Sequence, residues 1–151
     1  MIPAGAAYPP FVKPSIDSNR MPPYEDKVNY GGYLVNTAAC MDCHTPMEKG
    51  KFVMDKMFAG GFLFDMGTFK VNSANLTPDS ATGIGAWTEA MFLSRFTSKR
   101  DSAAIYYNPG KSNTLMPWTL FSKMDDYDIK AIYAYLRTLK PVKNMVVKNP
   151  S

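Results

Sequence analysis

Both cysteines and the single histidine of this 151-residue chain lie within five residues, Cys40-Met41-Asp42-Cys43-His44. This C-x-x-C-H spacing is the attachment signature of c-type haem. Each thiol adds to one vinyl group of the porphyrin, and the adjacent imidazole can bind the iron as its proximal ligand. The pattern therefore predicts one haem c, bound covalently through Cys40 and Cys43, with His44 as an iron ligand.

Three other interpretations of this cluster are weaker. A structural zinc site needs about four protein ligands, and the sequence has no other cysteine or histidine. A disulfide oxidoreductase carries C-x-x-C after a strand of a βαβ unit, whereas the residues before Cys40 have a helical pattern. A chance cluster of buried residues would not be expected to collect every cysteine and histidine of the chain.

The sixth iron ligand is less clear from the residues. With no second histidine, bis-histidine ligation within the chain is excluded, which leaves a methionine, a lysine, or an open or water-bound position. Among eleven methionines, Met116 is the first candidate, because the following Pro117 favours extended geometry at Met116 just before the last predicted helix. Met54, Met57 and Met66 in the middle of the chain are the alternatives.

The residues around this motif predict short helices and long loops. A helix is expected from about residue 25 to Cys40, and its Gly31–Gly32 pair indicates that another backbone passes close by, since glycine costs helix stability. Residues 45–86 lack sustained periodicity, so we expect loops around a cofactor, with a short strand pair near Phe62–Val71. Thr88 is a suitable cap for a helix that continues to about Ser98.

The last helix has the clearest pattern. Asp125 is its expected N-cap, Pro141 ends it, and between them lies one apolar stripe formed by Ile129, Ile132, Tyr133, Leu136 and Leu139. We expect this helix to cross the helix that contains Gly31 and Gly32, with an aromatic ring such as that of Tyr133 filling the space beside the glycines.

The composition of the chain limits which partners it can have and whether it can span a membrane. No apolar run approaches the roughly 20 residues of a membrane span, so no transmembrane segment is expected in this chain. The formal charge of +4 suits acidic redox partners, and no basic stripe with interleaved aromatic residues indicates nucleic acid.

Because haem c is attached outside the cytoplasm, we expect a periplasmic or extracellular protein, associated with a membrane only through a partner. No export signal is visible at the start, so we expect that the numbering begins near the mature terminus or that an upstream anchor is not included.

Residues 1–23 differ from the rest and are predicted to form an N-terminal arm, followed by one domain at 24–151. A proline-rich segment loses little entropy when it is fixed, so docking onto a neighbour is expected, either a respiratory complex or another copy in a homo-oligomer or filament. The alternative is that the arm wraps its own domain. The prolines of the arm are Pro3, Pro9, Pro10, Pro14, Pro22 and Pro23.

Further segments, in order, resemble one family. The chain is similar over about residues 30–144 to class I, monohaem bacterial cytochrome c domains, found in respiratory chains and as haem subunits of periplasmic dehydrogenases. The residues that carry the resemblance are Gly31-Gly32-Tyr33-Leu34-Val35, Cys40–Pro46, Asn75-Leu76-Thr77-Pro78-Asp79, Thr82-Gly83-Ile84-Gly85, Trp87-Thr88, Met116-Pro117-Trp118, Asp128, Ala131–Arg137 and Pro141-Val142.

The resemblance implies an all-α fold, the cytochrome c fold, with three main helices and long loops around one covalent haem. It implies that Met116 is the distal iron ligand. It also implies that Trp87 lies near a haem propionate and donates its indole N–H.

The expected function follows from this ligand set. An iron with both axial positions filled passes electrons and binds no substrate, so we expect a one-electron carrier between redox partners, not an enzyme. The alternative is a haem enzyme or gas sensor with an exchangeable sixth ligand. That alternative lacks the distal histidine or acid–base pair that such chemistry uses.

Overall fold

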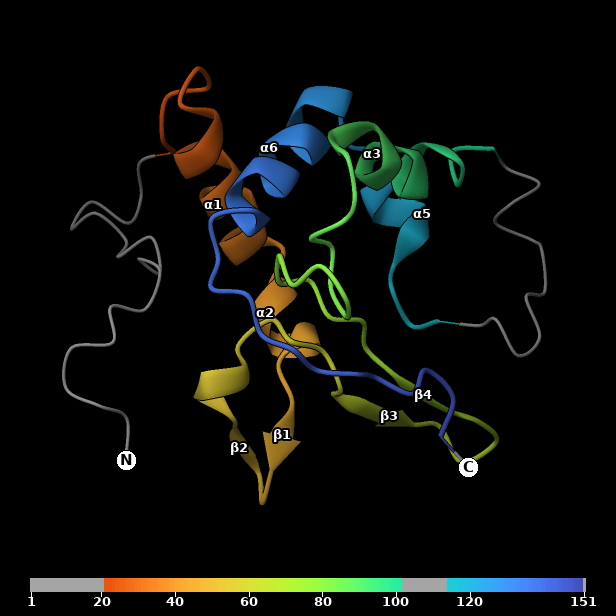
Figure 1. The fold of residues 1–151 in the computed structure, drawn as a ribbon. Helices are drawn as coiled ribbons and strands as arrows, with labels where there is room; N and C mark the ends of the chain where they lie inside the picture. Colours follow the sequence, from red (N-terminus) through yellow and green to blue (C-terminus); the bar gives the residue numbers. More distant parts are fainter. Residues whose placement is uncertain (1–20, 102–113, 151) are drawn as a thin grey trace, which may run out of the picture.

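The computed structural model of the chain describes residues 21–101 and 114–150 (Figure 1). Its three longest helices are the predicted ones, and short hairpins lie between the first and the second of them. The elements are α1 (Lys27–Thr37), α2 (Cys40–His44), β1 (Met47–Glu48), β2 (Lys51–Phe52), a 3₁₀ turn (Met54–Lys56), β3 (Leu63–Asp65), β4 (Lys70–Asn72), α3 (Glu89–Thr97), α5 (Trp118–Phe121) and α6 (Asp126–Leu136). The predicted arm falls almost entirely on residues 1–20, outside the described residues.

Helix α1 is shorter than predicted. Asp26 caps it by accepting a hydrogen bond from the Asn29 backbone N–H at 3.3 Å. The helix ends at Thr37, because Ala39 adopts a left-handed conformation with φ +52°. This residue separates α1 from the one-turn helix α2, which begins at Cys40. The expectation of one continuous helix to Cys40 is therefore wrong. The C-x-x-C-H segment forms a separate short helix, which the left-handed Ala39 divides from α1.

The two hairpins make the fold mostly helical instead of wholly helical. Strands β3 and β4 are antiparallel with Phe64 opposite Val71, which confirms the strand pair expected near 62–71. The β1–β2 hairpin was not expected. Its turn residues Lys49 and Gly50 both have positive φ, +50° and +74°, and two such residues suit a tight hairpin. Lysine in place of the usual Asn or Asp hides this signal in the sequence.

Of the two N-caps predicted for the later helices, one makes the expected hydrogen bond and the other does not. Thr88 caps α3 as predicted, because its Oγ1 accepts a hydrogen bond from the Met91 N–H at 3.1 Å. Asp125 occupies the N-cap position of α6, but its side chain makes no capping hydrogen bond. Helix α6 ends at Leu136, and the following Arg137 donates hydrogen bonds to the carbonyls of Ile84 and Gly85 at 3.3 and 2.6 Å. Arg137 thus ties the helix end to the loop before α3.

Helices α1 and α6 cross in direct backbone contact. A Cβ atom added at Gly31 would lie 1.9 Å from the carbonyl oxygen of Ala131. The predicted backbone neighbour of this glycine is therefore confirmed as the peptide group of Ala131, whereas the expected ring of Tyr133 lies elsewhere. The Tyr133 hydroxyl donates instead to the Trp87 carbonyl at 2.6 Å, and its ring packs against Phe92. A backbone contact requires that no side chain separates the two helices at this point.

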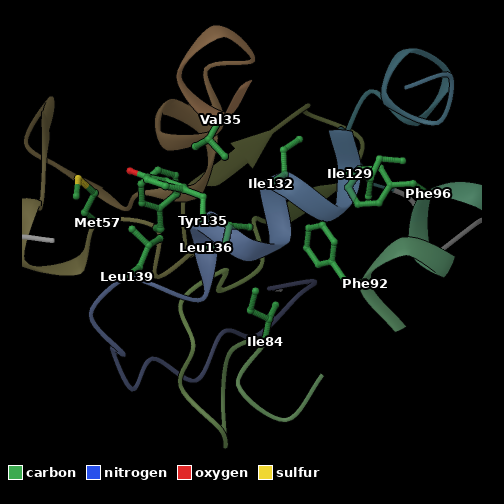
Figure 2. Close-up of a cluster of buried hydrophobic side chains, with 11 residues drawn as sticks. Val35, Met57, Ile84, Phe92, Phe96, Ile129, Ile132, Tyr135, Leu136 and Leu139 are labelled. Atoms are coloured by element: carbon green, nitrogen blue, oxygen red, sulfur yellow. The ribbon is translucent and has the colours of Figure 1, made fainter. Parts of the chain in front are cut away.

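Helix α6 supplies much of the core, with α1 on one side and α3 on the other (Figures 1 and 2). Among the described residues, no helix is long and apolar enough to cross a membrane. The buried cluster comprises Val35, Met57, Phe58, Ile84, Phe92, Phe96, Ile129, Ile132, Tyr135, Leu136 and Leu139.

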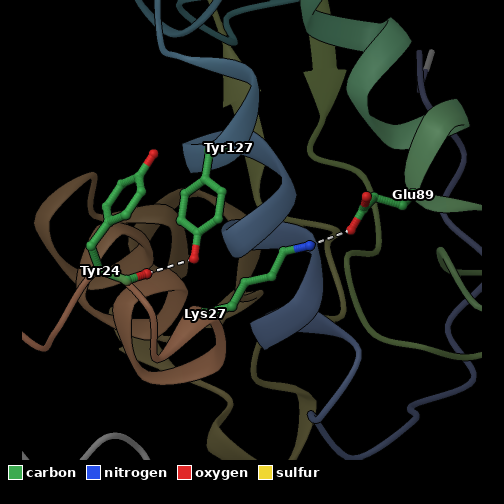
Figure 3. Close-up of polar contacts among 4 residues, drawn as sticks. All are labelled: Tyr24, Lys27, Glu89 and Tyr127. Carbon is green, nitrogen blue, oxygen red and sulfur yellow. Dashed lines mark hydrogen bonds and ion pairs between the residues drawn. The ribbon is translucent and has the colours of Figure 1, made fainter.

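Polar contacts at the surface also join the segment before α1 to α6, and α1 to α3 (Figure 3). The Tyr127 hydroxyl of α6 donates to the Tyr24 carbonyl at 2.5 Å, and the two rings stack with centroids 4.1 Å apart. The Lys27 ammonium of α1 pairs with the Glu89 carboxylate of α3 at 2.6 Å. The ion pair is half-exposed, so it contributes little energy. The backbone contact and the buried cluster therefore set the arrangement.

Substitution of Gly31 tests the crossing. Gly31→Ala should lower the free energy of unfolding by about 1–3 kcal/mol, because the added methyl group forces the two backbones apart. Denaturant unfolding of the haem-loaded protein measures the loss. Asn36→Ala, at an exposed position of the same helix, should change stability by less than about 0.5 kcal/mol. Equal stability of Gly31→Ala and the parent would contradict the contact.

Candidate haem site

Helix α2 presents the three residues of the predicted attachment site. Cys40 and Cys43 are free thiols one turn apart, so they lie on the same face of the helix. Cys40 packs against the buried cluster, while Cys43 is exposed. Burial raises the pKa of Cys40 to about 11 and also raises that of Cys43. Both side chains are therefore uncharged at neutral pH, and one face carries both sulfurs toward one edge of a flat ligand.

His44 is oriented by a backbone carbonyl. Its Nδ1 lies 2.7 Å from the carbonyl oxygen of Ala74. Because a carbonyl can only accept, the proton resides on Nδ1 and the lone pair on Nε2, which is the usual arrangement of a metal-binding histidine. Burial lowers the pKa of His44, and the bond to Ala74 opposes this only in part. The ring is thus a neutral imidazole with one nitrogen ready to bind iron, so the donor set fits a haem.

The loop that carries Ala74 crosses a second loop directly behind His44. Gly60 donates its N–H to the His44 carbonyl at 2.7 Å. It has φ +70°, and a Cβ atom there would lie 2.4 Å from the Ala74 carbonyl carbon. Leu76 donates its N–H to the Phe58 carbonyl at 2.8 Å. We call this crossing of residues 58–61 over 73–76 the proximal cradle.

The first residue after the attachment motif also holds the cradle. Thr45 is fully buried, and its Oγ1 accepts a hydrogen bond from the Phe58 N–H at 3.2 Å. Phe58 itself is buried with φ +61°, a conformation that is uncommon for a bulky residue. The hydrogen bonds on both sides of Phe58 maintain this conformation. The cradle is therefore tied to α2 through both His44 and Thr45.

Met116, the predicted sixth ligand, lies half-buried in the segment before α5 and packs against the buried cluster. Its carbonyl accepts a hydrogen bond from the Trp118 N–H at 2.7 Å. The Trp118 ring meets Phe96 of α3 edge-on, with centroids 5.4 Å apart. Cys40 and Met116, far apart in sequence, thus lie against the same core.

The alternative methionines have different surroundings. Met57 is a member of the buried cluster, with 8% of its surface exposed. Met54 and Met66 are exposed. Met116 differs from all three in lying at the surface of the core, on a segment that the following helix anchors.

Trp87 also packs against the buried cluster and is half-buried. The guanidinium carbon of Arg95 lies 5.8 Å from the centroid of its ring. Its backbone is fixed by the Tyr133 hydroxyl, while its indole N–H has no hydrogen-bond partner within the described part of the chain.

Comparison with known proteins identifies the family. The profile of the cytochrome c family matches residues 28–140. The chain belongs to the cytochrome c family. Membership implies covalently attached haem c and electron transfer through it, which agrees with the C-x-x-C-H motif on α2.

The curated relatives include parts of dehydrogenases. The cytochrome subunit of fructose dehydrogenase from Gluconobacter japonicus is 31% identical over 122 residues, which are 79% of this chain and 23% of that protein. The cytochrome c subunit of a quinone-dependent alcohol dehydrogenase from Gluconacetobacter polyoxogenes is 31% identical over 118 residues, 76% of this chain and 22% of that protein. The cytochrome c subunit of gluconate 2-dehydrogenase from Pantoea cypripedii is 32% identical over 108 residues, 72% and 22%. The chain spans less than a quarter of the length of these relatives.

The residue types predict candidate side chains for the site but not the backbone groups that orient them. Ala74 acts through its backbone carbonyl, which leaves no mark in residue type. The signal that could have indicated the crossing is the pair Gly60-Gly61, where both residues have positive φ, +70° and +84°. Two adjacent glycines in a loop next to an attachment motif indicate that a second backbone passes close by.

Two glycine substitutions separate this contact from simple backbone strain. Gly60→Ala should lower the free energy of unfolding by roughly 2–5 kcal/mol, since it adds a clash with Ala74 to the cost of positive φ. Gly67→Ala has the same strain at φ +75° but open space around it, so it should cost only about 1–2 kcal/mol. Denaturant unfolding and the haem absorbance per protein measure both. Equal effects would contradict the tight crossing.

Proposed function

We propose that this cytochrome c is a one-electron carrier whose haem is attached through Cys40 and Cys43, with His44 and Met116 as the axial ligands. The observation that carries the proposal is the 2.7 Å contact between His44 Nδ1 and the Ala74 carbonyl. This contact fixes the tautomer and leaves Nε2 as the only ring nitrogen that can bind iron. The position of Met116, on an anchored segment at the core surface, supports its role as the second ligand.

When bound, haem c supplies an Fe(III)/Fe(II) couple. His44 and Met116 would fill both axial positions, which leaves no position for a substrate and favours electron transfer. The thioether of Met116 favours the reduced state and raises the reduction potential relative to a second histidine. The hydrogen bonds of the cradle hold His44 in one orientation, so little rearrangement accompanies a change of charge.

We further propose that Trp87 binds a haem propionate. Its indole N–H is a donor without a partner among the described residues, and the Arg95 guanidinium beside its ring adds a positive charge. A hydrogen-bond donor next to a cation suits a carboxylate. Arg95 carries no such signal in the sequence, because a basic residue near the end of a helix has an ordinary explanation in the helix dipole.

The carrier would work outside the cytoplasm, in the periplasm or at the cell exterior. There it would accept electrons from a dehydrogenase or a quinol-oxidising complex and pass them to an oxidase or another cytochrome. The names of the relatives support a dehydrogenase as donor, and the formal charge of +4 supports acidic docking partners. Attachment of residues 1–23 to a neighbouring subunit or a second copy remains part of the proposal.

Haem attachment is the first test. The purified protein should contain one haem of c type, measured by its pyridine haemochrome spectrum, and the haem should stay with the protein in acid acetone. Cys43→Ala should retain a single thioether link, which shifts the haemochrome band. Haem that is fully extracted from the parent would contradict the proposal.

The sixth ligand is tested at Met116. Met116→Ala should abolish the methionine–iron charge-transfer band and lower the reduction potential, because a strong ligand of Fe(II) is lost, while haem remains attached. Met66→Ala, which truncates an exposed methionine, should leave both unchanged. Optical titration measures both quantities. Rapid, stoichiometric carbon monoxide binding by the parent at neutral pH would instead favour an exchangeable sixth position.

A further inference from the structure

The segment after α6 returns along the loops of the site. From Pro141 the chain runs back toward β3 and β4 (Figure 1). The Asn75 side-chain amide donates to the Val142 carbonyl at 2.9 Å, and the Asn72 amide donates to the Val147 carbonyl at 2.9 Å. We call residues 142–148 the C-terminal strap. It begins after residue 140, where the match to the family profile ends.

Asn144 is the residue of the strap that reaches the proximal cradle. Its side-chain Nδ2 donates to the carbonyls of Ala59 and Gly60 at 2.9 and 3.4 Å. Its backbone N–H donates to Thr82 Oγ1 at 3.0 Å, and the same oxygen accepts a hydrogen bond from the Asn75 amide at 3.1 Å. Asn144 therefore joins the Gly60 loop to the loop that contains Asn75, which directly follows Ala74.

A short path connects this amide to the histidine. Gly60, held by Asn144 through its carbonyl, donates its N–H to the His44 carbonyl at 2.7 Å. The α-carbon of Gly60 lies against the Ala74 carbonyl, as the 2.4 Å approach of an added Cβ shows. That carbonyl oxygen is the group 2.7 Å from His44 Nδ1. Any movement of Gly60 must therefore displace either the His44 backbone or the carbonyl that orients its ring.

We propose that Asn144 is a positioning residue for His44: it acts through Gly60 and Ala74 to keep the Ala74 carbonyl on Nδ1. Asn144 touches neither the ring nor the iron. The inference rests on the proposed ligation of iron by His44. It assigns to the strap a part in setting the reduction potential, in addition to its part in closing the fold.

The physical link is the strength of the Nδ1–H···O=C bond. A histidine that donates strongly through one nitrogen is a better electron donor through the other, and stronger donation stabilises the oxidised iron. If the Ala74 carbonyl moves away from Nδ1, the imidazole donates less. The reduction potential then rises, and the Nδ1 proton exchanges with water more readily because its acceptor is lost.

Asn144→Leu in the haem-loaded protein tests this, because leucine keeps the branched shape of the side chain and removes the donor. Proton NMR should show the His44 Nδ1–H exchanging roughly fivefold faster than in the parent, the factor that corresponds to one net hydrogen bond. The reduction potential should rise. Asn144→Ala, which also lacks the Nδ2 donor and adds no charge, should change both quantities in the same direction and serves if the leucine variant does not fold.

Asn72→Ala is the matched control. It removes another asparagine amide that bonds the same strap, at Val147, three residues beyond Asn144. The control should leave the exchange of Nδ1–H and the potential at parental values. Unchanged values in both Asn144 variants would overturn the inference, and so would equal changes in Asn72→Ala, since the effect would then belong to strap attachment in general. The parent is assigned first: if it shows no iron-bound His44 resonance, the proposed ligation has failed, independently of Asn144.

Discussion

The contact between two peptide backbones at Gly31 and Ala131 determines how the rest of the structure is placed. A Cβ at Gly31 would overlap the Ala131 carbonyl, so the helices α1 and α6 meet at the closest distance that two backbones allow. The residues on either side of the contact, Val35 of α1 and Ile132 of α6, then enter the same buried cluster. Because α2 follows α1 after only two residues, the crossing also places the attachment motif relative to α6.

Helix α6 connects the two sides of the site through the segments at its two ends. Before it, α5 and the Met116 segment are held to α3 by the contact of Trp118 with Phe96. The side chain of Arg100 adds hydrogen bonds to the carbonyls of Ser122 and Met124, both at 2.8 Å. After it, the strap reaches the proximal cradle through Asn144. One helix therefore fixes the origin of both segments that approach the iron in the proposed site.

The sequence predicts most where residue type alone carries the chemistry. Cys40, Cys43 and His44 are recognisable because few other functions use that spacing. The cap of α3 at Thr88 is likewise local, because the bond between the Thr88 side chain and the Met91 N–H spans three residues. The break at Ala39 could not be predicted, since alanine favours helix and its left-handed conformation is imposed by tertiary packing. The same holds for the Ala74 carbonyl, which any residue would supply.

At Gly31 the expected backbone neighbour is confirmed, whereas the expected ring of Tyr133 is not beside it. A glycine pair in a helix indicates that another backbone passes close by, but it does not say where the nearby aromatic ring points. The Tyr133 hydroxyl bonds the Trp87 carbonyl instead, and so fixes the backbone of the residue proposed to bind a propionate.

The asparagines that bond the strap show what the sequence does not reveal about long-range contacts. Asn72, Asn75 and Asn144 resemble ordinary loop residues in sequence, and their importance follows from separations of 65 or more residues between bonded partners. Long-range bonds of this kind cost chain entropy that only the assembled core can offset, so the strap keeps its place only while the α1–α6 crossing is intact.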